Sequence, residues 1–349
     1  MKPKVSVIGA SGYVGGELLR LLLTHPSVEV KYCYSRSFAK KYIHTVHPNL
    51  RKKSELMFTD EDPVSIASQS DISFFALPHG QSSKIMHTVL ETGTRVIDLG
   101  ADFRLEDPED YKIWYKFEHP SPSLLQKFVY GLPELWAFKI KGARNIAVPG
   151  CIATSAILSL APLAKMIQTT AIVDAKVGSS GSGGKPSPAT HYSERFGVVR
   201  VYKPAGHRHT AEIIQEISKI KGEKVNISMS AHAVNMVRGI QTTTHIPSDD
   251  IPDIKELWRQ FRQFYSNSPF VRIVRDKQGN NKYPDPKFTI GSNFADVGFE
   301  IDVEGRRVLA FGALDNLVKG AAGNAVQCMN LMMGFDEEEG LGYIPLHPV

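Results

Sequence analysis

The sequence is poor in cysteine. Its three cysteines, Cys33, Cys151 and Cys328, are spread over 349 residues, and no two form a Cys-x-x-Cys pair. Three thiols are too few for a disulfide framework, and their spacing excludes the usual paired-cysteine zinc sites. We therefore expect free thiols in a reducing compartment and predict a cytoplasmic protein.

Long hydrophobic runs are also absent. No apolar stretch reaches the roughly 18 residues that a transmembrane helix requires, so we expect no membrane partner. The start, Met1-Lys2-Pro3-Lys4-Val5, enters a strand-like segment without the apolar core and cleavage site of a signal peptide. The length and the ordinary apolar content of 42% predict a globular protein of two domains.

Acidic residues are missing from positions 36–53, which we call the basic segment. It contains six basic residues, namely Arg36, Lys40, Lys41, Arg51, Lys52 and Lys53. The rest of the chain is nearly balanced, so this segment accounts for the net charge of +5. The segment is either a solvated loop or a docking surface for an acidic group. No nucleic-acid motif accompanies it, and we expect no nucleic-acid partner.

A glycine-rich turn lies between a first strand, residues 5–9, and a helix, residues 17–23. Gly9, Gly12 and Gly15 have the spacing that permits a tight turn, close approach of a pyrophosphate and close helix packing. A purely structural turn is the alternative. The residues expected to bind a dinucleotide are Gly9, Ser11, Gly12, Tyr13, Val14 and Gly15.

The end of the second strand indicates which dinucleotide binds. NAD-binding domains usually carry an acid here for the ribose 2′-hydroxyl, whereas this chain has Ser35, Arg36 and Ser37. Hydroxyls and a guanidinium suit a 2′-phosphate, which favours NADP(H). The alternative is that Arg36 is an ordinary surface charge.

Alternating strands and helices continue to about residue 150, which predicts an α/β, Rossmann-type parallel sheet. Beyond that point the pattern changes. Strand-like segments with few intervening helices predict an α+β domain with a mainly antiparallel sheet. These segments are residues 171–177, 225–229, 241–246, 296–302 and 307–313.

Cys151 has the context of a nucleophile. It directly precedes an apolar segment, residues 152–163, that reads as a helix. A thiol at a helix N-terminus is favoured as thiolate by the helix dipole. The His207-Arg208-His209 cluster could supply the partner for covalent acyl chemistry. The two histidines lack a third ligand at a useful spacing, and we expect no metal.

The glycine- and serine-rich residues 178–184 precede Lys185. They do not form a P-loop, because Ser179 stands at the first glycine and Pro186 at the Ser/Thr position. Lys185 and the glycines either grip a phosphate or form a mobile loop.

Seven motifs, in order along almost the whole chain, resemble the N-acetyl-γ-glutamyl-phosphate reductase family. They are Gly9–Gly15, Ala76–Gly80, Asp98–Arg104, Tyr130–Glu134, Pro149–Cys151, His207–Thr210 and Asn316–Gly323. This family is related to aspartate-semialdehyde dehydrogenase and reduces a γ-acyl phosphate to an aldehyde with NADPH. The resemblance implies that Cys151 forms a thioester, that His207 is its acid/base partner, and that Arg208 or His209 holds the substrate.

The resemblance also implies an organisation. Residues 1–150 and 314–349 would form the NADP-binding domain, with Asn316 near the nicotinamide and a returning C-terminal helix. Residues 151–313 would form the catalytic domain, through which a homo-oligomer, dimer or tetramer, assembles. His79 and Arg104 lie in family-like motifs and either contact substrate or only tie loops together.

Departures from the family pattern suggest a branch. Residues 148–154 read VPGCIAT where NPGCYPT is frequent, and Ala211 stands where proline is common. These variants are similar to the branch whose substrate is carried by the small acidic amino-group carrier protein LysW, in lysine biosynthesis and in some archaea also arginine biosynthesis. The basic segment fits an acidic carrier.

Two alternative functions and the choice of substrate within the carrier branch stay open at this stage. The first alternative is the N-acetylglutamyl enzyme of ordinary arginine biosynthesis. The second is a non-enzymatic NADP(H)-binding redox sensor in which Cys151 is only oxidised. Within the carrier branch, glutamyl and aminoadipyl substrates differ by one methylene, which leaves no clear mark in a sequence.

Overall fold

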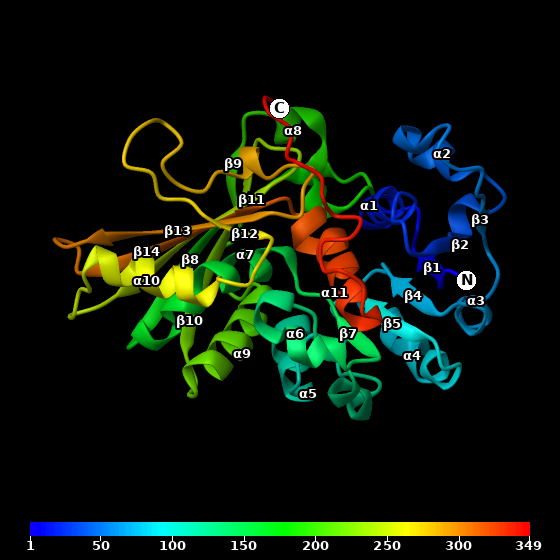
Figure 1. The fold of residues 1–349 in the computed structure, drawn as a ribbon, viewed down its shortest axis with the longest axis horizontal. Helices are drawn as coiled ribbons and strands as arrows, with labels where there is room; N and C mark the ends of the chain where they lie inside the picture. The colour runs from blue at the N-terminus through cyan, green and yellow to red at the C-terminus, as the bar shows by residue number, and fades with distance from the viewer. The chain divides into compact units, whose positions relative to one another are not determined.

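A computed structural model describes residues 1–349, which form two compact units. Unit 1 comprises Met1–Pro149 and Ala321–Gly342, and unit 2 comprises Gly150–Gly320 and Tyr343–Val349 (Figure 1). The sequence predicted that residues 314–349 return to the NADP-binding domain, whereas in the structure only Ala321–Gly342 belong to unit 1.

Unit 1 contains a seven-stranded, wholly parallel sheet in the order β3-β2-β1-β4-β5-β7-β6. The predicted Rossmann-type fold is confirmed. The central strands are buried almost throughout, as expected of a parallel sheet covered on both faces. The strands are β1 (Lys4–Ile8), β2 (Glu29–Tyr34), β3 (Phe58–Thr59), β4 (Ile72–Phe75), β5 (Arg95–Asp98), β6 (Val129–Tyr130) and β7 (Asn145–Ala147).

The helices of unit 1 include one from the far end of the chain. They are α1 (Tyr13–Leu22), α2 (Ile43–Val46), α3 (Pro63–Ser68), α4 (Ser82–Glu91), α5 (Pro108–Asp110), α6 (Pro133–Lys141) and α11 (Gly323–Met333). Helix α11 packs beside α1 and α6. Its Asn324 and Cys328 side chains both donate to the Gly131 carbonyl, and Asn330 bonds His25 at 2.9 Å.

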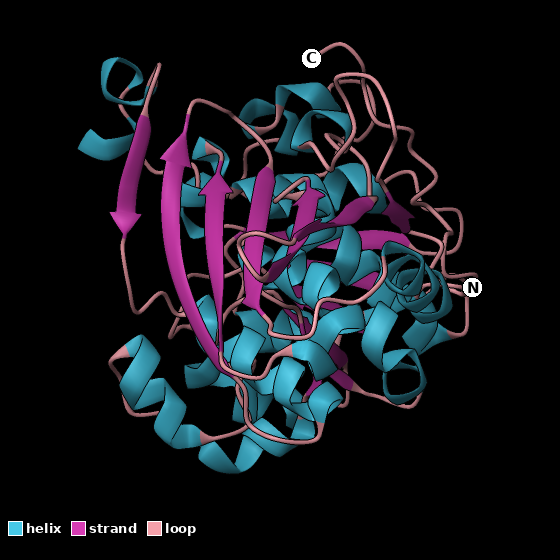
Figure 2. Ribbon diagram, turned by 90° about the vertical axis from the view of Figure 1, so that its left-hand side faces the viewer, coloured by secondary structure: helices cyan, strands magenta, loops and turns pink.

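Unit 2 contains a second seven-stranded sheet, in the order β12-β13-β14-β11-β8-β10-β9 (Figure 2). Four of its six strand pairs are antiparallel, which confirms the predicted mainly antiparallel sheet, and β8/β10 and β12/β13 are parallel. The strands are β8 (Thr170–Val177), β9 (Val199–Lys203), β10 (Asn226–Val234), β11 (Ile240–Pro247), β12 (Val271–Ile273), β13 (Ala295–Asp302) and β14 (Arg307–Leu314).

Four helices belong to unit 2, and the helix that begins at Cys151 packs on the central strands of the sheet. They are α7 (Cys151–Leu160), α8 (Tyr192–Arg195), α9 (His209–Lys221) and α10 (Ile254–Phe264). Every residue of α7 after Cys151 is buried. A Cβ at Gly312 of β14 would lie 2.5 Å from the Ser155 carbonyl oxygen, so glycine allows the helix backbone to lie on the strand. This contact lies in the middle of α7, at Ser155.

The structure has no helix that is both long enough and apolar enough to cross a membrane.

Candidate active site

Cys151 is the first residue of α7 and is partly exposed. Gly150 precedes it as the N-cap, and no side chain caps the helix. The first N–H groups of a helix have no intrahelical acceptor, so they are available to a negative charge beside the cysteine. The predicted thiol at a helix N-terminus is therefore present.

Close packing holds the residue before the nucleophile. The Gly150 N–H donates to Glu212 Oε2 at 2.9 Å, and the Glu212 side chain is completely buried. A Cβ at Gly150 would lie only 2.3 Å from His209 Nε2. A Cβ at Gly320 would similarly lie 2.7 Å from the Cβ of Cys151. Glycine is thus required at position 150, directly before the cysteine, and at position 320, where a distant part of the chain packs against it.

His207 is buried, with 9% of its surface exposed. Burial, followed by the Arg208 and Lys203 charges, lowers the pKa of His207 to about 4. The backbone N–H of His209 donates to His207 Nδ1 at 3.2 Å. Nδ1 is therefore an acceptor, and this hydrogen bond assigns the proton of the neutral ring to Nε2.

Tyr202 joins this group, and the sequence analysis did not identify it. Its hydroxyl lies 3.4 Å from His207 Nε2. Desolvation of its hydroxyl and the nearby Cys151 raise the pKa of Tyr202 to about 12, although 45% of the residue's surface is exposed, so the hydroxyl keeps its proton at neutral pH. Strand β9 shifts register against β10 around Tyr202, and a bulge of this kind redirects a side chain.

The remaining predicted substrate residues lie in different environments. Arg208 is exposed and close enough to lower the pKa of His207, whereas His209 is buried against Gly150. Lys185 is exposed at the end of the glycine-rich stretch. Their contacts with a substrate stay predictions.

Asn316 is 3% exposed and is engaged inside unit 2. Its Oδ1 accepts the Gly239 N–H at 2.8 Å, and its Nδ2 donates to Ser180 Oγ at 2.9 Å. Ser180 N–H also donates to the Val237 carbonyl. Asn316 thus fastens the turn of residues 179–182, and its proposed place near a nicotinamide stays a prediction.

The glycine turn in unit 1 fits a dinucleotide. Gly9 has φ +91°, and a Cβ there would lie 2.3 Å from the Ala76 carbonyl oxygen. A Cβ at Gly15 would lie 2.5 Å from the Gly9 carbonyl oxygen. Gly12 differs, because the protein atom nearest to its Cβ position is 3.6 Å away. The middle glycine therefore leaves room for a phosphate at the uncapped start of α1.

The predicted 2′-phosphate residues follow β2. Ser35 is buried and donates from its hydroxyl to Ser11 Oγ at 2.8 Å, which joins the end of β2 to the glycine turn. Arg36 and Ser37 are exposed. Arg36 makes no ion pair, and its Nε lies 3.4 Å from the Tyr34 hydroxyl. These positions fit a ribose phosphate.

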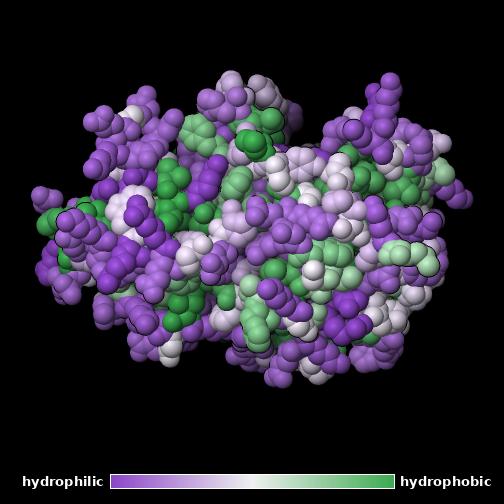
Figure 3. All heavy atoms as spheres, viewed as in Figure 1, coloured by the Kyte–Doolittle hydropathy of each residue, from purple (hydrophilic) through white to green (hydrophobic).

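The six cations of the basic segment are all exposed and form no ion pair. In Figure 3 the surface over α2, within this segment, is largely hydrophilic. The segment is anchored by His47, whose Nε2 bonds the Ala10 carbonyl at 2.8 Å and whose ring fills the space beside Gly16. Burial lowers the pKa of His47. The basic segment is thus fixed against the glycine turn.

Two buried carboxyl groups meet at the end of β5. Asp102 accepts hydrogen bonds from Gly80 N–H, Ser82 Oγ–H and Ser83 N–H at 2.6–3.0 Å. Asp98 accepts a longer bond, 3.3 Å, from Gly100 N–H. Burial and the Asp102 charge raise the pKa of Asp98 to about 7. The two carboxyl groups are both completely buried, and Asp98 is the one with the poorer set of hydrogen bonds.

His79 and Arg104 tie loops together. The Ala101 N–H donates to His79 Nδ1 at 3.2 Å. Arg104 is buried, and it donates to the carbonyls of Val148 and Leu99 at 2.7 and 2.9 Å. Arg104 therefore supports the segment that leads to the nucleophile.

The other two cysteines are buried, as expected. Burial raises the pKa of Cys33 to about 12, and Cys328 donates to the Gly131 carbonyl. No group of three or more His, Cys, Asp or Glu side chains is arranged to hold a metal ion.

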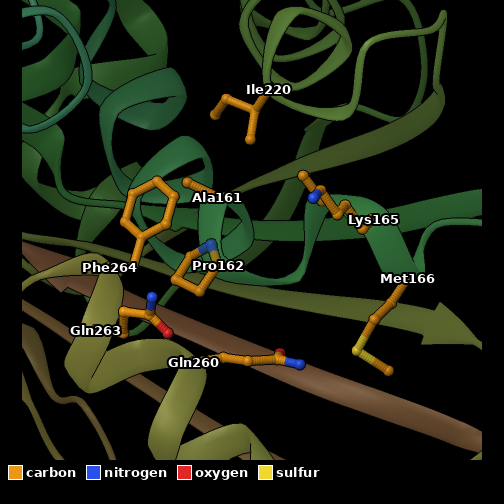
Figure 4. Close-up of a pocket in the computed structure, with 9 residues that line it drawn as sticks. Ala161, Pro162, Lys165, Met166, Ile220, Gln260, Gln263 and Phe264 are labelled. Atoms are coloured by element: carbon orange, nitrogen blue, oxygen red, sulfur yellow. The ribbon is translucent and has the colours of Figure 1, made fainter.

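A groove of about 540 Å³ lies elsewhere in unit 2 (Figure 4). Its lining is mostly apolar and contains no nucleophile: Ala161, Pro162, Ala164, Lys165, Met166, Ile220, Gln260, Gln263 and Phe264. Neither Cys151 nor His207 lines this groove.

Comparison with protein families gives two matches that together span most of the chain. Residues 4–143 match the NAD-binding domain of semialdehyde dehydrogenase, and residues 151–316 match its dimerisation domain.

Curated relatives match over the full length. A protein of Pyrobaculum aerophilum is 51% identical over 99% of this chain and 100% of its own length. It carries the provisional name LysW-L-2-aminoadipate/LysW-L-glutamate phosphate reductase. A Thermomicrobium roseum protein, provisionally named LysW-L-2-aminoadipate 6-phosphate reductase, is 48% identical over 100% of both chains.

Solved structures agree in fold. Aspartate semialdehyde dehydrogenase II of Vibrio cholerae has a TM-score of 0.69 at 18% identity, covering 96% of this chain and 99% of the other. The Candida albicans aspartate semialdehyde dehydrogenase, solved with NADP, has a TM-score of 0.65 at 15% identity, covering 95% and 99%.

Proposed function

Because this chain belongs to the semialdehyde dehydrogenase family, we propose that it is an NADPH-dependent acyl-phosphate reductase. Its substrate is a γ-glutamyl or δ-aminoadipyl phosphate attached to the acidic carrier protein LysW, and its products are the semialdehyde and phosphate. The pathways served are lysine biosynthesis, arginine biosynthesis or both. The observation that carries the chemistry is Cys151 at the start of α7, beside Tyr202 and His207.

The covalent step uses Cys151. Its thiolate, favoured by the helix dipole, forms a C–S bond to the acyl carbon. The C–O bond to phosphate breaks, and its electron pair leaves with the phosphate. After reduction of the resulting thioester, the C–S bond breaks and its electron pair returns to sulfur. The first N–H groups of α7 would stabilise the oxyanion in both steps.

We propose that His207 takes the acid part of its predicted acid/base role, as a hydrogen-bond donor. The neutral ring carries its proton on Nε2, because Nδ1 accepts the His209 N–H. Neutral imidazole can stabilise a developing oxyanion by donating from nitrogen, as in triosephosphate isomerase. Tyr202 orients the ring through its hydroxyl.

The cofactor is bound by unit 1. When bound, NADPH supplies the hydride that converts the thioester carbonyl to the aldehyde. Gly12 and the start of α1 would hold the pyrophosphate, and Ser35 and Arg36 would hold the 2′-phosphate. The absence of an acid at the end of β2 supports NADP(H) over NAD(H).

The basic segment is the proposed carrier-docking surface. Six exposed cations without counter-ions would attract an acidic protein, and a small acetylated amino acid would not need them. The names of the relatives agree with a LysW-bound substrate.

NADPH oxidation with two acyl phosphates tests the function. One substrate is N-acetylglutamyl phosphate, the other is the glutamyl or aminoadipyl phosphate on LysW, and Cys151→Ser is the blank. We expect turnover only on the carrier, weakened when Arg51, Lys52 and Lys53 are neutralised together. Turnover on the free substrate alone would identify an N-acetylglutamyl enzyme, and turnover on neither would refute the reductase.

We also propose a homo-oligomer, a dimer or tetramer, assembled through unit 2 in the cytoplasm. The match of residues 151–316 to a dimerisation domain supports the interface. The free thiols support a reducing compartment. Size-exclusion chromatography with light scattering measures the assembly state directly.

A further inference from the structure

Arg195 is a cation without a counter-ion. It ends α8, and its Nη2 donates to the Val177 carbonyl at 2.8 Å, at the end of β8. Its Nε–H is buried and has no acceptor. The adjacent carboxylate does not serve it, because Glu194 pairs with Arg200 at 3.6 Å. A buried guanidinium N–H without an acceptor is costly unless a ligand supplies one.

The surroundings of Arg195 are positively charged. Burial, followed by the Arg200 charge, lowers the pKa of Arg195. The Tyr202 hydroxyl lies within electrostatic range of Arg195, Arg208 and Cys151 at the same time. Arg195 and Cys151 are therefore both electrostatic neighbours of Tyr202, and an anion bound beside Arg195 would relieve the repulsion between the cations.

We propose that Arg195 is a substrate-binding residue, which uses its unpaired Nε–H to bind an anionic oxygen group of the substrate. This inference rests on the proposed function. Two such groups occur in a carrier-bound acyl phosphate: the phosphate that leaves, and the α-carboxylate that stays free when the amino group is attached to the carrier. Arg195 differs from Lys185, Arg208 and His209 because its anchored guanidinium has a defined direction.

The reverse reaction distinguishes the two groups, because semialdehyde and inorganic phosphate are then separate substrates whose KM values are measured individually. If Arg195 binds the phosphate, Arg195→Gln raises the KM for inorganic phosphate at least tenfold and leaves that for the semialdehyde within twofold. If it binds the carboxylate, Arg195→Gln raises the KM for the semialdehyde at least tenfold and leaves that for inorganic phosphate within twofold. Arg200→Gln, which removes a cation already paired with Glu194, is the matched control and leaves both values within twofold.

Arg195→Lys keeps the charge but not the Nε–H, and it raises the same KM value by a smaller factor. Thermal melting shows whether each variant folds. If Arg195→Gln does not fold, Arg195→Lys decides. A folded deciding variant with both KM values unchanged overturns the proposal.

A second measurement is independent of turnover. Inorganic phosphate or acetate should slow alkylation of Cys151 by iodoacetamide in the wild type, and Arg195→Gln should remove this protection. If the wild type reduces neither acyl phosphate, the proposed function fails, and the alkylation experiment still tests Arg195. Protection by neither anion, or protection that survives Arg195→Gln, overturns the inference.

Discussion

The carboxyl pair at the end of β5 predicts an unusual dependence of stability on pH. Asp98 is completely buried, and burial together with Asp102 raises its pKa to about 7. An unfolded aspartate has a pKa of about 3.9. The native state therefore binds this proton more tightly than the unfolded state does. The contribution of Asp98 to the free energy of unfolding is largest in acid and falls as the pH rises from about 4 to about 7.

The magnitude follows from the difference of about 3 pKa units. At about 1.4 kcal/mol per unit, ionisation of Asp98 lowers the free energy of unfolding by about 4 kcal/mol in all. About 2.5 kcal/mol of this loss falls between pH 5 and pH 8. Asp98→Asn cannot ionise and has nearly the same shape, so it removes this dependence. The variant should gain about 2.5 kcal/mol relative to wild type over this interval.

Urea unfolding of wild type and Asp98→Asn at pH 5 and pH 8 gives four free energies of unfolding. The change between the two pH values in the variant is then compared with the change in wild type. Asp60→Asn is the control, because Asp60 is exposed and should leave the pH dependence of wild type unchanged. If Asp98→Asn follows the wild-type pH dependence within about 0.5 kcal/mol, the pKa of Asp98 is not raised by burial and by Asp102 as described.

Three further outcomes are expected. Arg36→Ala should raise the KM for NADPH about tenfold and leave that for NADH unchanged, because only the former has a 2′-phosphate; an equal rise for both would refute its role. Gly150→Ala places a methyl group 2.3 Å from His209 Nε2 and should lower kcat at least tenfold, whereas Gly142→Ala, whose Cβ meets nothing closer than 3.9 Å, should leave kcat unchanged. Cys33→Ser should not change the rate of thiol alkylation in the native protein, because burial raises the pKa of Cys33 to about 12; a slower rate would show that Cys33 is accessible.

Local patterns predicted much of the fold. The glycine turn and the helix at Cys151 were recognisable because their requirements lie within a few residues of sequence. The helix expected at residues 152–163 is α7, which begins at Cys151 and continues after Leu160 as a 3-10 helix. Pro162 lies in that continuation, where it removes one backbone donor.

The residues of the site were harder to predict from the sequence than the fold, because they contact residues far away in the chain. Asn316 bonds partners 77 and 136 residues away, which no local pattern reveals. Tyr202 can be recognised as a site residue only from the structure, in which the bulge in β9 places its hydroxyl near His207. Glu212 follows the His207–Thr210 motif closely, but its bond to Gly150 spans 62 residues.

The prediction of secondary structure in unit 2 was also incomplete. Helices α9 and α10 were not expected, since the strand-like segments dominated the pattern. Helix α10 has only two buried residues, Leu257 and Phe261, so most of its length carries polar side chains. A helix with so narrow an apolar stripe is difficult to distinguish from a polar loop.

His47 has a consequence for the order in which ligands bind. One imidazole connects the basic segment to the nucleotide turn, through the Ala10 carbonyl and the space beside Gly16. A protein that shifts this segment on docking therefore also changes the affinity of the turn for its nucleotide. By thermodynamic reciprocity the nucleotide changes the affinity for the docked protein by the same factor. A single partly buried side chain would thus couple binding of the proposed carrier to binding of the nucleotide.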